Sequence, residues 1–193
     1  SKEFLNVSKE NEDKMIEALI YSLTEIKEIK KIKILVENNN FTTLPNSNKK
    51  LPEYLDKNYG INKIYNLDSL KETSKTTIYY LSKNKDYYYY IPVTKVSNEK
   101  LERVEIIIKE LKSTPIYHTN LISYLASSTS MTNYELLEST ISLSFNNYLI
   151  ANLKDDAVLE EVKYSIALSL RDTYGINEVI FSIPDMENTR ISV

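Results

Sequence analysis

The sequence lacks several residue types on which common catalytic and metal sites depend. Its 193 residues include no cysteine, which excludes disulfides, thiolate metal sites and cysteine nucleophiles. The two glycines, Gly60 and Gly175, lie far apart, so the chain cannot form a glycine-rich phosphate loop or a dinucleotide-binding turn. The single histidine is His118. These absences predict a protein with no metal and no cofactor.

Excess positive charge and long apolar runs are also absent. The 24 Lys and Arg residues stand against 27 Asp and Glu residues, so the net charge is −3 and no basic surface for nucleic acid is expected. No apolar run approaches the ~18–20 residues of a membrane span. Residues 1–10 have no apolar signal-peptide core, so we expect any export signal or lipid anchor to lie upstream of them. The composition, 42% hydrophobic and 26% charged, is typical of a globular protein.

A first stretch of the sequence predicts a helix followed by two strands. Apolar residues recur every three or four positions over residues 10–28, which predicts a helix. Residues 31–37 then alternate as a strand does, 38–40 are turn residues, and 41–45 return as a second strand. The expected buried stripe of the helix consists of Met15, Leu19, Leu23 and Ile26.

The same pattern closes the chain, 147 residues later. A helix is expected over 155–174, with Gly175 in the left-handed position just past its end, and strands are expected over 176–183 and 189–193. When the two stretches are superposed without a gap, apolar residues meet apolar residues across about 30 positions. This agreement indicates an internal repeat.

The repeat fixes the expected domain boundaries. Only one full copy fits in the chain, so residues 76–193 are interpreted as a complete second domain. Residues 1–45 are interpreted as the C-terminal half of a first domain, whose other half we expect to precede the chain. Residues 46–75 are interpreted as a linker that carries some docking side chains.

The complete domain is expected to have an α+β fold. Residues 76–81 and 87–93 predict a hairpin, and Ser97 is the expected N-cap of a helix over 97–112. A second hairpin is expected around a turn at 145–147, between strands over 136–143 and 148–153. The sequence therefore predicts a small mixed β-sheet with both long helices packed on one face.

Four segments together resemble a known family. IEALIYSLTEIKEIKKIKILVEN, TTIYYLSKNKDYYYYIPVTKVSNEKLERVEIIIKELKSTP, ELLESTISLSFNNYLIANL and GINEVIFSI follow one another as the signature segments of the GerM-domain family of sporulation and spore germination proteins do. Asn38-Asn39 and Asn146-Asn147 stand where that family usually has glycine, and asparagine also tolerates left-handed turns. The chain is similar to tandem GerM repeats with the first repeat truncated at its N-terminus.

This resemblance implies a function as well as a fold. It implies a non-enzymatic assembly module of a sporulation or germination envelope complex, in the space between mother cell and forespore. It further implies an extracytoplasmic lipoprotein held to the membrane by an upstream lipid anchor. Its domains would be similar to ring-building modules, its partners would be other envelope proteins, and it could form a homo-oligomer or ring.

Catalytic arrangements are poorly supported by the sequence. A hydrolase would have to pair His118 with a nearby serine and with a carboxylate such as Glu135, but no nucleophile elbow is present. The candidate serines are Ser123, Ser127 and Ser128. We therefore expect no enzymatic activity.

Runs of like charge have an ordinary structural explanation. Asp155-Asp156 and Glu160-Glu161 could form a cation site, but acidic residues at the start of a helix are expected to compensate its dipole. The lysines between residues 27 and 33 are interpreted as a solvated helix end, because Glu28 interrupts them.

The tyrosine run 87–90 is the most informative exposed feature. In a strand, Tyr89 and Ile91 would face the core, and Tyr88 and Tyr90 would face the other way. Tyrosine is common in strands, which is one explanation of the run, but tyrosine is also enriched in protein interfaces. Together with Ile180 on the same expected sheet face, Tyr88 and Tyr90 form our candidate interface. The alternative function is a ligand-binding module for wall glycan or peptide, which requires aromatic side chains and carboxylates grouped in a groove.

Overall fold

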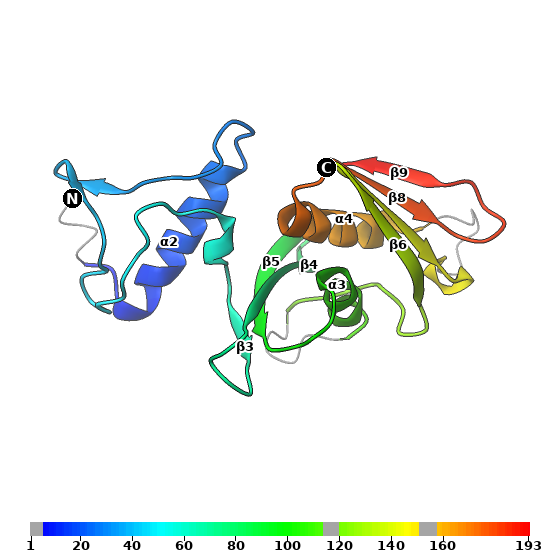
Figure 1. Ribbon diagram of the computed structural model, residues 1–193, viewed down its shortest axis with the longest axis horizontal. Helices are drawn as coiled ribbons and strands as arrows, with labels where there is room; N and C mark the ends of the chain where they lie inside the picture. Colours follow the sequence, from blue (N-terminus) through cyan, green and yellow to red (C-terminus); the bar gives the residue numbers. More distant parts are fainter. Residues whose placement is uncertain (1–5, 114–119, 151–157) are drawn as a thin grey trace. The chain divides into compact units, whose positions relative to one another are not determined.

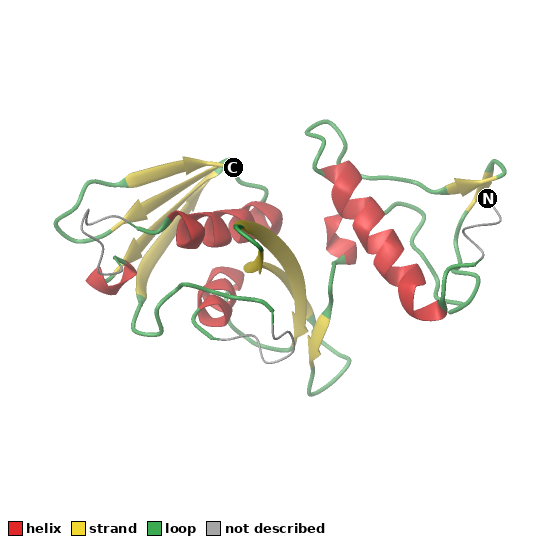
Figure 2. Cartoon of the chain, turned by 180° about the vertical axis from the view of Figure 1, so that it is seen from behind, coloured by secondary structure: helices red, strands yellow, loops and turns green. Residues whose placement is uncertain are grey.

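The computed structural model describes residues 6–113, 120–150 and 158–193 (Figure 1). The chain divides into two compact units, Ser1–Lys63 and Ile64–Val193. The fold is mixed α+β, as the sequence predicted (Figure 2). Among the described residues, no helix combines the length and the apolar character needed to cross a membrane.

The first unit is one helix with an extended chain folded against it. Helix α2 (Lys9–Thr24) is followed by a two-residue hairpin, β1 (Leu35–Val36) and β2 (Asn39–Asn40), and by the short 3-10 helix η1 (Lys57–Tyr59). The hairpin turns at Glu37 and Asn38, both of which have positive φ. Such a turn matches the twist of paired strands.

The strands of this unit are shorter than the sequence predicted. Residues 31–37 contribute the two-residue strand β1 and an isolated bridge at Ile32, and residues 41–45 contribute only an isolated bridge at Thr43. Ile32 exchanges two backbone hydrogen bonds with Leu55, at 2.8 and 2.9 Å. The hairpin pairing is thus confined to residues 34–41, and Ile32 and Thr43 pair instead with the segment that follows the hairpin.

The buried stripe of α2 also differs from the predicted one. The residues that pack in the core are Ile16, Ile20 and Tyr21, whereas Leu19 is 39% and Ile26 49% exposed. The helix is thus rotated by about one residue from the expected orientation, because the rest of the core comes from the later chain segment rather than from a sheet. That segment supplies Leu44, Leu51 and Leu55.

Buried acidic side chains hold the same segment to α2. The fully buried Glu12 accepts hydrogen bonds from the backbone N–H groups of Asn46 and Ser47, at 2.6 and 2.8 Å. Glu17 accepts from the N–H of Asn62 at 2.8 Å and from Lys63 Nζ at 2.6 Å. The interpretation of 46–75 as a linker is therefore corrected: its first part is a folded portion of the first unit.

The second unit contains two sheets rather than the single sheet we expected. A three-stranded sheet has the order β3-β5-β4, and a four-stranded sheet has the order β6-β7-β8-β9. The strands of the first sheet are β3 (Ile64–Asn66), β4 (Ser74–Asn84) and β5 (Tyr87–Ser97). Those of the second are β6 (Met131–Leu137), β7 (Thr140–Phe145), β8 (Glu178–Ser182) and β9 (Thr189–Ser192).

Two local details of this unit also differ from the expectation. Helix α3 (Arg103–Leu111) is capped by Glu102 and Glu105 in a reciprocal capping box, while Ser97 ends β5. The β6–β7 hairpin turns just after Leu137, at Glu138, whose φ is positive, and not at 145–147. Residues Asn147–Leu149 form the 3-10 helix η2, and the end of the expected strand, 151–153, lies outside the described residues.

One hydrophobic core joins the helices and both sheets of the second unit. Helix α4 (Glu160–Tyr174) lies between the β4–β5 hairpin and the four-stranded sheet (Figure 1). Its Ser169 hydroxyl accepts a hydrogen bond from the N–H of Tyr79 at 2.9 Å, and Asp172 accepts one from the Tyr79 hydroxyl at 2.6 Å. These hydrogen bonds hold β4, and with it the paired strand β5 that carries the tyrosine run, against α4.

Candidate functional site

The tyrosine run lies at the tip of the β4–β5 hairpin. Tyr88 pairs with Lys83 and Tyr90 with Leu81, so both tyrosines lie on the face of the hairpin that also carries Tyr79. Tyr79 contacts α4, so this is the face that α4 covers. Tyr88 and Tyr90 thus lie on the opposite face from Ile91, as strand alternation requires, but the expectation that they face away from the helices is wrong, because α4 packs on their side of the hairpin.

The opposite face of β5 only partly follows the prediction. Ile91 packs against the core as expected, but Tyr89 is 50% exposed. Residues 83–89 are all exposed, which shows that the hairpin tip extends past the core. Alternation alone fixed the side of the strand on which Tyr89 lies, but not how far the core reaches.

Tyr88 and Tyr90 form one wall of a groove that is completed by α4. The groove has a volume of about 300 Å³ and is lined by Tyr88, Tyr90, Tyr164, Glu160 and Glu161; we call it the tyrosine groove. The rings of Tyr90 and Tyr164 lie with their centroids 6.1 Å apart. The two glutamates come from the first turn of α4. The groove therefore combines π faces with carboxylates.

A second pair of tyrosines extends this surface. Tyr124 approaches Tyr88 edge to face, with ring centroids 6.2 Å apart and hydroxyl oxygens 3.1 Å apart. Lys83 Nζ lies 5.5 Å from the Tyr88 ring centroid on the hairpin. Tyr124 carries no signal in the sequence that would have linked it to the run at 87–90.

The electrostatics of the groove favour neutral hydroxyls beside negative charge. Burial, and then the charges of Glu161 and Glu160, raise the pKa of Tyr90 to about 12. The hydrogen bond with Tyr88 raises the pKa of Tyr124. At neutral pH Tyr90 and Tyr124 are thus uncharged hydrogen-bond donors, and the carboxylates of the groove lining belong to Glu160 and Glu161.

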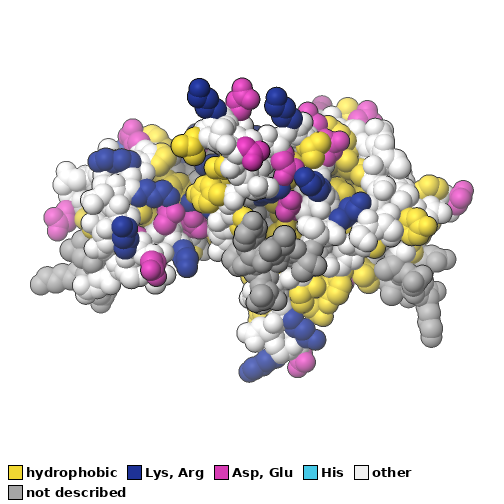
Figure 3. All heavy atoms as spheres, turned by 90° about the horizontal axis from the view of Figure 1, so that it is seen from below, with side chains coloured by type: hydrophobic (Ala, Val, Ile, Leu, Met, Phe, Trp, Pro, Cys, Tyr) yellow, Lys and Arg dark blue, Asp and Glu magenta, His cyan; other side chains and the backbone are white. Residues whose placement is uncertain are grey.

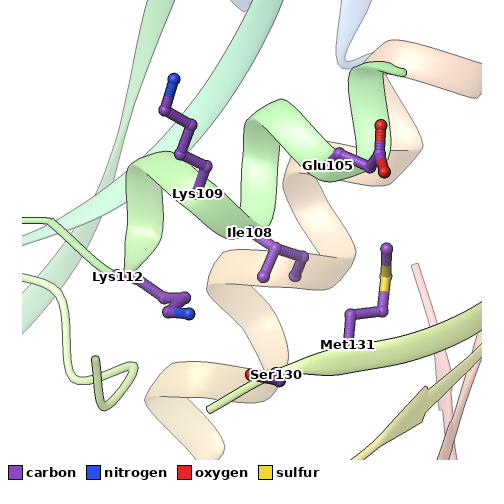
Figure 4. Close-up of a pocket in the computed structure, with 6 residues that line it drawn as sticks. All are labelled: Glu105, Ile108, Lys109, Lys112, Ser130 and Met131. Carbon is purple, nitrogen blue, oxygen red and sulfur yellow. The ribbon is translucent and has the colours of Figure 1, made fainter. Parts of the chain in front are cut away.

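Another pocket, also of about 300 Å³, lies between α3 and β6 (Figure 4). Ile108 and Met131 form its apolar part, between the side chains of Glu105 and Lys112. Glu105 is already bonded to the N–H of Glu102 in the capping box, at 2.9 Å. Because Glu105 serves the capping box and Lys109 pairs with Glu99, this pocket offers less for recognition than the tyrosine groove.

The third member of our candidate interface, Ile180, is not brought to this site. It lies in β8 of the four-stranded sheet, between Ser142 and Arg190, whereas Tyr88 and Tyr90 belong to the other sheet. The expectation that all three share one sheet face is therefore wrong, because the strands are divided between two sheets.

The residues considered for catalysis gain no supporting geometry. His118, Asp155 and Asp156 lie outside the described residues. The Ser123 hydroxyl donates to the backbone carbonyl of Leu111 and so serves to hold a loop. Among the described residues, no group of three or more potential metal ligands comes together.

Charge is mixed on the one face of the molecule that Figure 3 draws. On the face drawn in Figure 3, lysine and arginine side chains alternate with aspartate and glutamate side chains. This distribution fits the net charge of −3, and the described residues of this face form no basic stripe along which a phosphate backbone would bind.

Comparison with known proteins places the fold. No family model matches the chain. It is 27% identical over 184 residues to the spore germination protein GerM of Bacillus subtilis (strain 168), an alignment that covers 93% of this chain and 50% of that protein. The chain therefore spans about half the length of the curated relative it matches.

One solved structure has the same fold. The tandem GerMN domains of the sporulation protein GerM from Bacillus subtilis match with a TM-score of 0.84 and 24% identity, over 94% of this chain and 64% of that one. The isolated first GerMN domain of the same protein matches with a TM-score of 0.46 and 19% identity, over 59% of this chain and 85% of that one. The chain is thus a homologue of the spore germination protein GerM and has the fold of tandem GerMN domains.

Proposed function

We propose that this protein is a non-enzymatic assembly module of a sporulation or germination envelope complex between mother cell and forespore. Its similarity to GerM supports a sporulation-related role. The observation that carries the finer proposal is a cluster of partly exposed tyrosines, Tyr88 and Tyr90 on the β4–β5 hairpin and Tyr124 beside them. In this proposal the protein is extracytoplasmic and held to the membrane by a lipid anchor outside residues 1–193.

Exposed tyrosines fit a contact surface better than a catalytic one. Tyrosine is enriched at interfaces because it offers a large, rigid apolar area together with a hydroxyl. Burying two of them could contribute roughly 2–4 kcal/mol, which is a weak contact by itself. Repetition in an oligomer or ring, or alongside other envelope proteins, would make such a contact strong.

The test replaces the two groove tyrosines together. A Tyr88→Ser/Tyr90→Ser variant is expected to keep its far-UV circular dichroism and to lose recruitment to the envelope complex and sporulation efficiency. Tyr148→Ser is the matched control, because Tyr148 is 64% exposed and lies outside the tyrosine groove. Normal sporulation in a correctly folded double variant would contradict the proposal.

A second function has one observation in its favour. The tyrosine groove groups aromatic rings with carboxylates, which is the arrangement that a glycan- or peptide-binding module requires. Binding of peptidoglycan fragments to the purified chain, measured by calorimetry, would support this function. The same measurement with Tyr164→Leu would show whether the groove is responsible.

A further inference from the structure

The tyrosine groove has the components of a site for a positively charged group. Tyr90 and Tyr164 present their rings to it from two different elements, β5 and α4. Glu160 and Glu161 place two carboxylates beside these rings. Among the described residues, neither glutamate has an ion-pair partner.

The first unit shows how this chain holds its own lysines. Lys63 Nζ lies 4.1 Å from the Tyr59 ring centroid and 2.6 Å from Glu17. Lys49 lies 4.8 Å from the same ring, and its Nζ is 2.6 Å from Asp13. In both cases an ammonium group sits between a π face and a carboxylate.

Two more lysines repeat this arrangement. Lys33 lies 5.4 Å from the Tyr54 ring and 2.8 Å from Glu53. Lys57 lies 5.6 Å from a tyrosine ring and pairs with a carboxylate at 2.5 Å. The tyrosine groove has the rings and the carboxylates of this arrangement. Lys83 lies over the Tyr88 ring at one end of it, but no described lysine pairs with Glu160 or Glu161 beside the rings of Tyr90 and Tyr164.

We propose that the tyrosine groove binds a lysine or arginine side chain of a partner protein. The proposal rests on the proposed assembly function and names the chemistry of the partner. The rings of Tyr90 and Tyr164 would attract the cation and cover its apolar stem, and Glu160 and Glu161 would pair with its charge.

The position of the glutamates on α4 does not cancel this attraction. A helix N-terminus carries about half a positive charge, whereas two carboxylates carry two negative charges. The groove therefore keeps a net negative potential after the dipole is compensated. A neutral sugar would stack on the rings but would leave these charges without a partner, so the charge balance favours a cationic side chain.

The test uses acetyl-trilysine amide as the probe and acetyl-triglutamine amide as the neutral control. In a titration of the full chain followed by amide NMR shifts, trilysine is expected to perturb Glu160, Glu161 and Tyr164, and to bind more weakly as salt is added. Triglutamine is expected to leave these signals in place.

Matched variants locate the interaction. Glu160→Gln/Glu161→Gln is expected to weaken trilysine binding by about tenfold or more. Glu135→Gln/Glu187→Gln removes the same charge from exposed positions outside the groove and is expected to leave binding unchanged. Tyr90→Phe keeps the ring and should retain binding, whereas Tyr164→Leu should lose most of it.

Several outcomes would overturn the proposal. Equal weakening by the two glutamate pairs would mean that only net charge matters. Perturbation of the groove by chitotriose but not by trilysine would make the site a glycan site. Trilysine binding that depends on the groove, with normal sporulation in the Tyr88→Ser/Tyr90→Ser variant, would support the cation site and contradict the assembly function.

Discussion

Helices α2 and α4 occupy equivalent places in the sequence repeat, but they bury different faces. Ile166 of α4 is fully buried, whereas Leu19, which lies 147 positions earlier, is 39% exposed. In α2 the buried residues are instead Ile16 and Ile20. The second unit supplies a β-hairpin against the Ile166 side of its helix, and the first unit packs an extended chain against the neighbouring side. Periodicity therefore predicts a helix, while its surroundings decide which side is buried.

The two units nevertheless use the same device to bury a lysine. Lys63 lies between Asp13 and Glu17 in the first unit, with 7% of its side chain exposed. Lys95 lies between Glu99 and Glu110 in the second unit, with 8% exposed. The first unit has far fewer buried apolar residues, so we expect it to depend more strongly on its ion pairs.

The largest effect is expected from removing these lysines. Lys63→Met leaves two carboxylates beside each other and is expected to destabilise the first unit by about 3–5 kcal/mol. Urea unfolding followed by NMR signals of each unit should show the first unit unfolding early while the second is unchanged. Lys27→Met is the exposed control. A loss below about 1 kcal/mol in Lys63→Met would show that the ion cluster is dispensable.

A second comparison tests the two helix faces directly. Ile166→Ala is expected to cost about 2–5 kcal/mol, because it opens a cavity in a fully buried site. Leu19→Ala should change stability by less than about 0.5 kcal/mol, since the side chain is partly exposed. Ile20→Ala checks that α2 itself is sensitive on its buried face. Equal losses at Leu19 and Ile166 would mean that both helices are packed alike.

The C-terminal ends of the two helices differ as well, and the expected effect on stability is smaller. Helix α4 ends at Gly175, which has φ 69° and donates its N–H to Arg171 at 2.8 Å, whereas α2 ends at Glu25 in a right-handed conformation. A Cβ at Gly175 would meet open space, so Gly175→Ala should cost only the backbone strain, about 1–2 kcal/mol. Thermal unfolding would measure this loss of stability, and Gly175→Asn should lose less stability than Gly175→Ala, because asparagine tolerates the left-handed conformation. An unchanged melting temperature would contradict this.

The smallest expected difference between the two units is in how their stability changes at low pH. Burial raises the pKa of Asp13, but the hydrogen bonds from Lys49 and Tyr59 and the charge of Lys63 lower it more. The net result is a pKa below the ordinary aspartate value of 3.8. Hydrogen bonds from Lys109 and Lys95 lower the pKa of Glu99 below 4.5. The stability that a depressed carboxyl pKa confers is present above the unfolded-state value and is lost as pH falls through the folded-state value.

Both units should therefore lose stability as the pH falls below the ordinary carboxyl pKa values of 3.8 and 4.5, and the first unit should lose more than the second. Burial raises the pKa of Glu12 as well, and its hydrogen bonds from Asn46 and Ser47 outweigh this, so the first unit has a second depressed carboxyl group. Urea midpoints of the two units at pH 7 and pH 3.5 provide the measurement. A larger shift in the second unit would reverse the comparison.

The sequence was most informative for elements whose formation depends on neighbouring residues, such as hairpin strands and a helix end. The strands of the β4–β5 hairpin, the left-handed cap at Gly175 and the final hairpin were all predicted. Each depends on neighbouring residues alone. The separation of Tyr88 and Tyr90 from Ile91 followed from strand alternation in the same way.

Long-range pairing was what the sequence could not provide. The buried face of α2 could not be predicted, because it includes Glu12 and Glu17, and acidic residues are normally expected to lie in solvent. The grouping of the strands into two sheets, which separates Ile180 from Tyr88, depends on contacts across the whole chain. The tyrosine groove was likewise hidden: Glu160 and Glu161 were visible only as helix-terminal acids.

The buried lysines also provide a chemical record of folding. An amine-reactive acylating reagent can modify Lys63 or Lys95 only when the ion cluster around that residue opens. Exposed lysines such as Lys27 and Lys30 react without any opening. Mass spectrometry of briefly labelled protein would therefore report the opening frequency of each unit separately, from two residues that the native chain already contains.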